Sequence, residues 1–151
     1  MWWIDGALYR APTLEQRGAC IARLKPSPAP RSTALQFISP AAALVGFEED
    51  GKLLRVELDL EPRVREVLAF ADRRSFVRQG ALVVAADEVL VGEYGVFPSA
   101  RCANLHRSRD GGRTFRLSKS AFAASIHLVG WLASGAVVVT TGDLPANAAA
   151  T

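Results

Sequence analysis

The chain has little cysteine, with only Cys20 and Cys102, and the two form no C-x-x-C pair. No histidine cluster at metal-ligand spacing accompanies them, so neither a zinc site nor dithiol chemistry is indicated, and both are expected to be buried free thiols. Apolar runs of membrane-spanning length are absent, and the N-terminus resembles no signal peptide. We therefore expect no metal, no cofactor and no membrane partner. The chain as given would be cytoplasmic, while the compartment of any longer parent stays open.

Runs of like charge are also lacking, although 18 Lys+Arg against 15 Asp+Glu give a formal net charge of +3. Only Arg101, Arg107, Arg109 and Arg113 come close together in sequence. Without interleaved aromatic residues, these arginines are interpreted as a solvated hairpin surface, and no nucleic-acid partner is expected. No Walker motif, nicotinamide fingerprint or Ser/His/Asp order occurs, so those chemistries have no support.

What the sequence does contain is a repeat. The segment A-L-V-G-F at 43–47 is echoed by V-L-V-G-E at 89–93 and more loosely by V-V-V-T-T at 137–141. A second element recurs at a similar spacing, since L-Y-R at 8–10, L-L-R at 53–55 and L-H-R at 105–107 each place a Leu two residues before an Arg. A fixed period of roughly 40 to 50 residues is typical of β-propeller blades.

Each repeat divides into four short β-rich runs separated by turn residues. The complete units predict strands at roughly 34–39, 43–48, 52–58 and 64–70, and at 81–86, 88–94, 103–108 and 113–118. The chain begins inside a unit, with strands at 2–5, 7–10 and 19–24, and ends with strands at 125–132 and 136–141. The predicted fold is all-β, a partial β-propeller of about three four-stranded blades over residues 1–143, followed by a loose tail at 144–151.

Two segments have a competing interpretation. Val64, Val67 and Leu68 sit at helical spacing, so 61–70 could form a helix, and 13–24 could do so on similar grounds. We favour strands in both places because each falls where the repeat requires a fourth strand, and local propensity is a weak guide.

The most specific motif is S-R-D-G-G-R-T-F at 108–115. Its Asp and Ser side chains can bond nearby backbone N–H groups while its glycines accept positive φ, which predicts a hairpin turn that supplies its own hydrogen-bond partners. A Thr can tie the returning strand to the turn, and the final aromatic ring can pack beneath it. The positions that carry this structural role are Ser108, Asp110, Gly112, Thr114 and Phe115.

This segment resembles the S-x-D-x-G-x-T-[WF] pattern of the Asp box, or BNR repeat, and roughly 44–143 is similar to sialidase-like, glycosyl-hydrolase-like propellers. In those families the box joins the third and fourth strands of a blade, at the periphery and away from the central site. The resemblance implies six blades, of which this length supplies about half, so the chain would be a fragment or one half of a pair. The box predicts fold better than function.

Sialidase-like enzymes use an arginine triad, a Tyr nucleophile with a neighbouring Glu, and an Asp acid/base. The Y-R-A-P at 9–12 only partly matches the motif of the first arginine. Glu93 and Tyr94 are adjacent on a strand and must point to opposite faces, so they do not form a simple nucleophile pair.

The catalytic residues are unknown, and the candidate ligand-binding residues are Glu93, Tyr94, His127 and Asp143. Each also has a structural interpretation, in which Glu93 or Tyr94 packs between blades, His127 is a satisfied histidine and Asp143 bonds its own turn. His106 is expected to face solvent.

The sequence therefore predicts a non-catalytic or inactive BNR-repeat propeller segment that acts as a scaffold or as a carbohydrate- or protein-binding surface. The alternative is a glycoside hydrolase of sialidase-like type whose remaining blades come from a second copy or from missing sequence. The expected partners are a carbohydrate or protein ligand and a second copy that completes the propeller. Whether the chain is an enzyme is left open.

Overall fold

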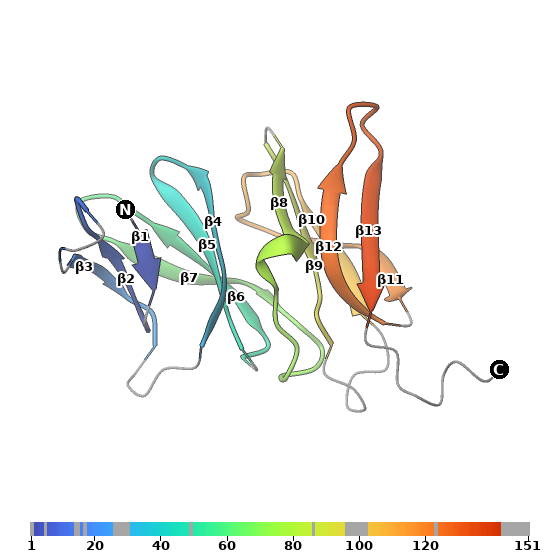
Figure 1. Cartoon of the computed structure of the whole chain (residues 1–151), viewed down its shortest axis with the longest axis horizontal. Coiled ribbons are helices and arrows are strands. Elements are labelled where there is room, and N and C mark those ends of the chain that lie inside the picture. Colours follow the sequence, from blue (N-terminus) through green and yellow to red (C-terminus); the bar gives the residue numbers. More distant parts are fainter. Residues whose placement is uncertain are drawn as a thin grey trace.

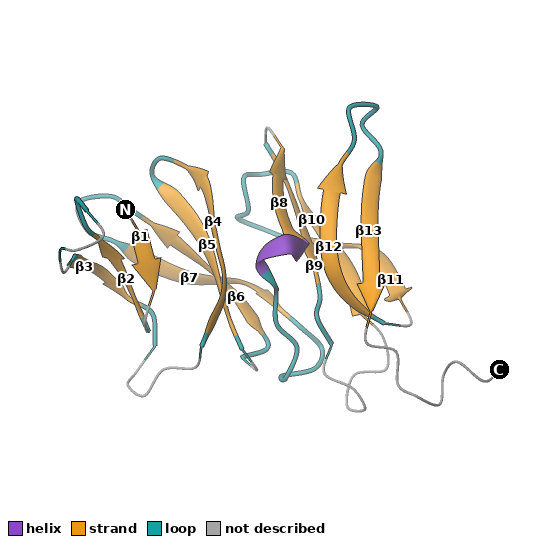
Figure 2. Ribbon diagram, in the orientation of Figure 1, coloured by secondary structure: helices purple, strands orange, loops and turns teal. Residues whose placement is uncertain are grey.

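The computed structural model describes residues 2–4, 6–13, 16, 18–25, 31–48, 50–85, 87–95, 103–122 and 124–142, with the backbone alone for 2–4 and 121. These residues are all-β, as expected, with a single turn of 3-10 helix (Figure 2). The elements are β1 (Trp2–Ile4), β2 (Ala7–Arg10), β3 (Ala19–Arg23), β4 (Ser32–Ser39), β5 (Ala42–Phe47), β6 (Lys52–Glu57), β7 (Arg63–Ala69), η1 (Gln79–Ala81), β8 (Leu82–Ala85), β9 (Glu88–Gly92), β10 (Ala103–Ser108), β11 (Arg116–Phe122), β12 (Ser125–Trp131) and β13 (Val137–Gly142).

The strands form four antiparallel sheets, each made from strands that follow one another in the chain. The first sheet has the order β1-β2-β3, the second β4-β5-β6-β7, the third β11-β10-β9-β8 and the fourth β12-β13. Figure 1 shows the sheets side by side in chain order, from the first sheet near the N-terminus to the fourth near the C-terminus. Short connections between consecutive strands account for this simple order, because a tight turn can only join antiparallel neighbours.

Both segments with a competing helical interpretation are strands, since β7 occupies most of 61–70 and β3 lies within 13–24. One predicted strand is displaced, because 113–118 was expected and β11 spans Arg116–Phe122. It nevertheless pairs antiparallel with β10, as predicted. Asp143 and the predicted tail at 144–151 lie outside the described residues.

Apolar side chains on facing sheets make three buried clusters. Leu8 from the first sheet meets Val45 and Phe47 from the second. Leu44 and Leu53 from the second sheet meet Val89 and Val91 from the third, and Leu90 and Leu105 from the third meet Ile126 and Val129 from the fourth. Successive residues of β9 therefore serve different clusters, as the two-residue alternation of a strand requires. The inner strands β5 and β9 are therefore buried on both faces.

Glycine allows the third and fourth sheets to approach closely. A Cβ atom on Gly92 would lie 2.4 Å from Cγ2 of Ile126, a distance that real contacts do not reach. The same approach brings the backbone N–H of Ile126 to the carbonyl of Glu93, at 3.0 Å. Burial of apolar surface contributes roughly 25 cal/mol per Å², so the three apolar clusters are the main source of stability.

The predicted burial of the two cysteines can be checked for Cys20, because Cys102 lies outside the described residues. Cys20 is a free cysteine but is exposed, so the prediction that it is buried is wrong. It lies on β3, the outer strand of the first sheet, where one side chain in two faces away from the neighbouring sheet. Among the described residues, no helix is long and apolar enough to cross a membrane.

Candidate functional site

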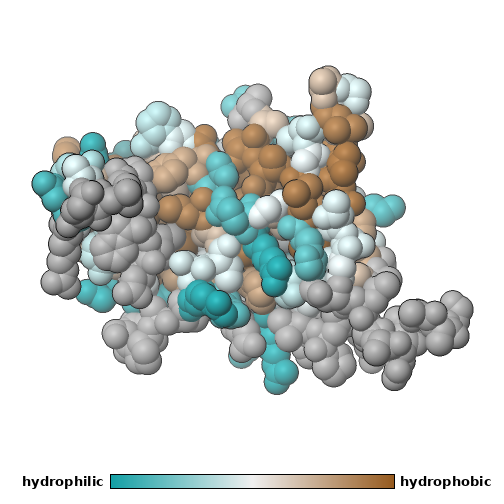
Figure 3. All heavy atoms as spheres, in the orientation of Figure 1, coloured by the Kyte–Doolittle hydropathy of each residue, from teal (hydrophilic) through white to brown (hydrophobic). Residues whose placement is uncertain are grey.

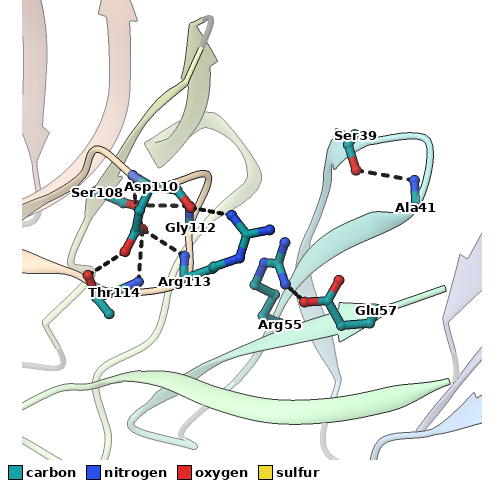
Figure 4. A network of polar contacts seen from close by, with 9 residues as sticks. All are labelled: Ser39, Ala41, Arg55, Glu57, Ser108, Asp110, Gly112, Arg113 and Thr114. Carbon is teal, nitrogen blue, oxygen red and sulfur yellow. Dashed lines mark hydrogen bonds and ion pairs between the residues drawn. The ribbon is translucent and has the colours of Figure 1, made fainter. Parts of the chain in front are cut away.

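The turn between β10 and β11, residues 109–115, makes an extensive set of side-chain hydrogen bonds. The Ser108 hydroxyl donates to Oδ1 of Asp110 at 2.7 Å and accepts from the backbone N–H of Gly112 at 2.8 Å (Figure 4). Oδ1 of Asp110 also accepts from the backbone N–H groups of Arg113 and Thr114, both at 3.0 Å. Oδ2 accepts from the Thr114 hydroxyl at 2.6 Å. The sequence-predicted roles of Ser108, Asp110 and Thr114 in the turn are present.

These donors stabilise the ionised carboxylate. The hydrogen bonds from Thr114, followed by the one from Ser108, hold the pKa of Asp110 well below its usual range. Gly111 and Gly112 have φ of 66° and 75°, in the left-handed region that favours glycine. The turn is therefore fixed by its own side chains and by two glycines.

The same turn packs against the second sheet. A Cβ atom on Gly112 would lie 3.3 Å from Cδ1 of Leu44 and 3.5 Å from Cδ1 of Ile38, so the backbone of the turn rests on those side chains. Phe115 packs on the cluster shared by the second and third sheets. Figure 4 shows the Arg113 side chain reaching from the turn toward Arg55 of β6.

Arg55 is the charged group that this turn covers. Its side chain is 8% exposed and forms an ion pair with Glu57. Burial lowers the pKa of Arg55, and the positive charge of Arg113 lowers it further, whereas the Asp110 carboxylate raises it. A buried guanidinium requires nearby negative charge, and Glu57 supplies it as the ion-pair partner of Arg55.

A second arginine group lies in an open hollow of about 510 Å³ on the third sheet. We call it the arginine hollow; its lining includes Arg107, Arg109, Asp110, Thr114, Arg116 and Ser118. Arg107 binds both carboxylate oxygens of Glu88. Nε of Arg109 lies 3.3 Å from the same carboxylate. Of the three arginines, Arg107 and Arg109 share the Glu88 carboxylate, whereas the Asp110 carboxylate serves the turn.

The candidate ligand residues are only partly brought together. Glu93 is buried, and its carboxylate accepts a hydrogen bond of 2.7 Å from the Asn104 side chain. The Tyr94 ring lies 5.3 Å from the His127 ring and 4.8 Å from the Phe76 ring. Glu93 is therefore buried, and Tyr94 is partly buried against neighbouring rings.

The Tyr94 ring has a charged neighbour that sequence reasoning missed. The Arg78 guanidinium carbon lies 4.2 Å from the ring centroid, within the range of a cation–π contact. Nothing in the sequence linked Arg78 to a residue sixteen positions away. Phe76 and Tyr94 also form an isolated antiparallel bridge, which fixes the pair at the junction of the third and fourth sheets.

The other singled-out residues lie elsewhere. Arg10 is exposed on β2. His106 does not face solvent as expected: its ring is largely buried, with its centroid 5.7 Å from the Phe70 ring. Burial lowers the pKa of His106 to about 4. Among the described residues, no three His, Cys, Asp or Glu side chains are grouped as a metal ion requires.

Comparison with known proteins identified no relative of this chain. No family model, no curated protein and no solved structure matches the chain. The interpretation of the sites therefore depends on the sequence and the geometry described above.

Proposed function

We propose that this chain is a non-catalytic segment of a sialidase-like, Asp-box β-propeller, in which the sheets are blades and the 108–115 segment is the Asp box. In this proposal it is a scaffold that presents a carbohydrate- or protein-binding surface. The order of the sheets along the chain supports the propeller, because each blade of such a fold is a meander of consecutive antiparallel strands.

The observation that carries the non-catalytic part is how Glu93 and Tyr94 are used. The Glu93 carboxylate is buried on Asn104, and the Tyr94 ring is stacked among Phe76, Arg78 and His127. A nucleophile and its activating carboxylate must lie within hydrogen-bond reach of each other, whereas these two side chains serve separate packing contacts. Their arrangement favours structure over turnover.

The same stack supports a binding role. Tyr94 and His127 offer ring surfaces beside the Arg78 guanidinium, and aromatic rings with a few polar groups are the usual lining of a small-molecule site. A carbohydrate ligand fits this chemistry, because sugar C–H faces pack on rings while hydroxyls bond polar neighbours. A Tyr94→Ala variant should therefore lose binding while keeping its fold.

The test is to measure binding to immobilised glycans together with turnover of fluorogenic sialosides and other glycosides. We expect glycan binding without turnover, and loss of binding in Tyr94→Ala but not in Tyr9→Ala on β2. Clear turnover that disappears in Glu93→Gln or Tyr94→Phe would overturn the proposal in favour of a sialidase-like glycoside hydrolase. If neither glycan binding nor turnover is observed, the proposed binding surface is wrong and only the scaffold role remains.

A further inference from the structure

The arginine hollow lies on the third sheet, where β10 turns into β11. Its volume of about 510 Å³ is within the range of small-ligand sites. Arg107 comes from β10, Arg109 from the turn and Arg116 from the start of β11. Three guanidinium groups therefore line one concave surface from three separate backbone positions. The space-filling view of the molecule places this surface away from the apolar side chains gathered over β8, β12 and β13 (Figure 3).

Cross-strand register places two of these arginines directly opposite each other. Arg107 pairs with Arg116 across β10 and β11, so both side chains lie on the same face of the sheet. Like charges in this arrangement are unfavourable by themselves. A negatively charged group near both side chains would relieve the repulsion, and the open hollow leaves room for one.

The carboxylates of the chain do not neutralise the hollow. Arg107 binds both oxygens of Glu88, and Nε of Arg109 lies 3.3 Å from the same carboxylate. The Asp110 carboxylate accepts its hydrogen bonds within the turn. Among the described residues, the Arg116 side chain forms no ion pair. The three guanidinium groups therefore exceed the two carboxylates by one positive charge.

Part of the hollow is already organised within the chain. The contact with both oxygens of Glu88 fixes the Arg107 side chain, which is only 33% exposed. Ser118 also lines the hollow and lies two residues after Arg116 on β11, so a hydroxyl that can donate a hydrogen bond is on the same face. A fixed, half-buried guanidinium binds an anion better than a mobile, exposed one, because less side-chain freedom is lost and solvent screens the charges less.

We propose that the arginine hollow binds a tetrahedral oxyanion of the sulfate or phosphate type. One guanidinium group satisfies a planar carboxylate, as Arg107 does for Glu88, whereas a tetrahedral group presents acceptor oxygens in several directions. Guanidinium groups from β10, the turn and β11 match the second geometry. Two sources supply this chemistry, the free inorganic ion and a sulfate ester carried by a carbohydrate.

This site is separate from the proposed glycan-binding surface. Glu88, beside the hollow, is the first residue of β9, whereas Tyr94 lies two residues past the last one, Gly92. The two sites are therefore at opposite ends of β9, and binding at each can be measured without the other.

The test is an NMR titration of the chain with sodium sulfate, with sodium chloride added to keep the ionic strength constant. We expect saturable shifts in the backbone amide signals of residues 109–118. Arg116→Gln should weaken sulfate binding by about fivefold, because it removes one charge-assisted hydrogen bond. The matched control is Arg65→Gln, which removes the same charge from the equivalent exposed position on β7, opposite Arg55, and should bind as the wild type does.

A second variant guards against a folding defect in the first. Arg109→Gln, whose side chain is 73% exposed, should also weaken sulfate binding, and unchanged amide signals in the other sheets show that each variant is folded. The proposal is overturned if sulfate causes no saturable shifts, if acetate binds as tightly as sulfate, or if Arg116→Gln and Arg65→Gln weaken binding equally.

Further ligands identify the source of the anion. Tighter binding of N-acetylglucosamine-6-sulfate than of inorganic sulfate, with no binding of N-acetylglucosamine in the hollow, would support the proposal with the ester as the source. Equal binding of the two sulfates would support it with the free ion as the source. Loss of sulfate binding alone refutes this site, whereas loss of the glycan binding that depends on Tyr94 refutes only the proposed function.

Discussion

The second and third sheets place the same side chains at the same repeat positions, yet only one of the two sites is covered. On the second sheet, Gly112 of the following turn rests on Leu44, and Arg55 is almost fully buried. On the third sheet, Leu90 is buried by the fourth sheet, but Arg107 remains in an open hollow. The difference teaches that burial of these arginines depends on the neighbouring sheet rather than on their own strand. The variants below test that comparison.

The largest effect is expected where the turn touches the second sheet. Gly112→Ala introduces both a strained φ and a Cβ atom 3.3 Å from Leu44, so the free energy of unfolding should fall by about 2 to 3 kcal/mol. Gly111→Ala has similar backbone strain, but its Cβ would meet only Nη1 of Arg113, at 3.6 Å, and about 1 kcal/mol is expected. Urea unfolding measures the free energy of unfolding of both variants. Equal losses of free energy would mean that contact between Gly112 and the second sheet does not contribute.

The next effect concerns the covered face of β10, where His106 lies one residue before the open Arg107. The pKa of His106 is lowered to about 4, below its ordinary value of 6.5. The unfolded chain therefore binds the proton more readily, and stability should fall as the pH drops from about 6.5 to about 4. Because the His106 side chain keeps some contact with solvent, the loss should be roughly 1 to 2 kcal/mol.

Replacement of the histidine should remove this dependence. His106→Leu should show a flatter plot of unfolding free energy against pH over the same window, measured by urea unfolding at each pH. If the free energy of unfolding of His106→Leu varied with pH as steeply as that of the wild-type chain, other groups would cause the pH dependence. That result would contradict the interpretation of His106 as a neutral, covered side chain.

A smaller effect is expected within the turn. Asp110→Asn removes the charge that four donors stabilise, and should lower the free energy of unfolding by about 1 kcal/mol at neutral pH. The pKa of Asp110 lies below its ordinary value of 3.8, so its contribution is present above about that pH and is lost as the pH falls further. Acid unfolding should show this loss in the wild-type chain and not in Asp110→Asn.

The smallest effect is expected in the open site. Arg116→Glu replaces the like-charge pair across β10 and β11 with an opposite-charge pair, so the monomer should gain about 0.5 kcal/mol. The measurement is thermal unfolding at a concentration where both proteins are monomeric. A destabilised Arg116→Glu monomer would show that Arg116 already has a favourable partner within its own chain.

Much of the strand pattern could be predicted from the sequence, because turn residues and the repeat constrain the same boundaries. The displaced start of β11 shows the limit of that reasoning. In the turn, the N–H groups of Arg113 and Thr114 bond the Asp110 side chain instead of the β10 ladder, so pairing begins only at Arg116. The motif predicted these bonds, but not how far they would delay the strand.

The sites were less predictable, because they depend on which face of a strand meets a neighbouring sheet. His106 was expected to face solvent, but it lies on the side of β10 that meets the preceding sheet, where its ring is near Phe70. The same limit hid Arg78 and Asn104, which come from separate segments. The hollow required coordinates, since cross-strand register decides that Arg107 and Arg116 are opposite each other.

The hydrogen bonds of the 109–115 turn are made within the turn itself, and Nη1 of Arg113 adds to them by donating to the backbone carbonyl of Asp110 at 2.9 Å. Gly112 serves twice, because its N–H bonds the Ser108 hydroxyl while its backbone rests on Leu44 of the second sheet. The residues that preserve the shape of the loop are therefore also the ones that face the neighbouring sheet. A substitution such as Arg113→Glu changes the internal bonding of the loop and its outer charge together.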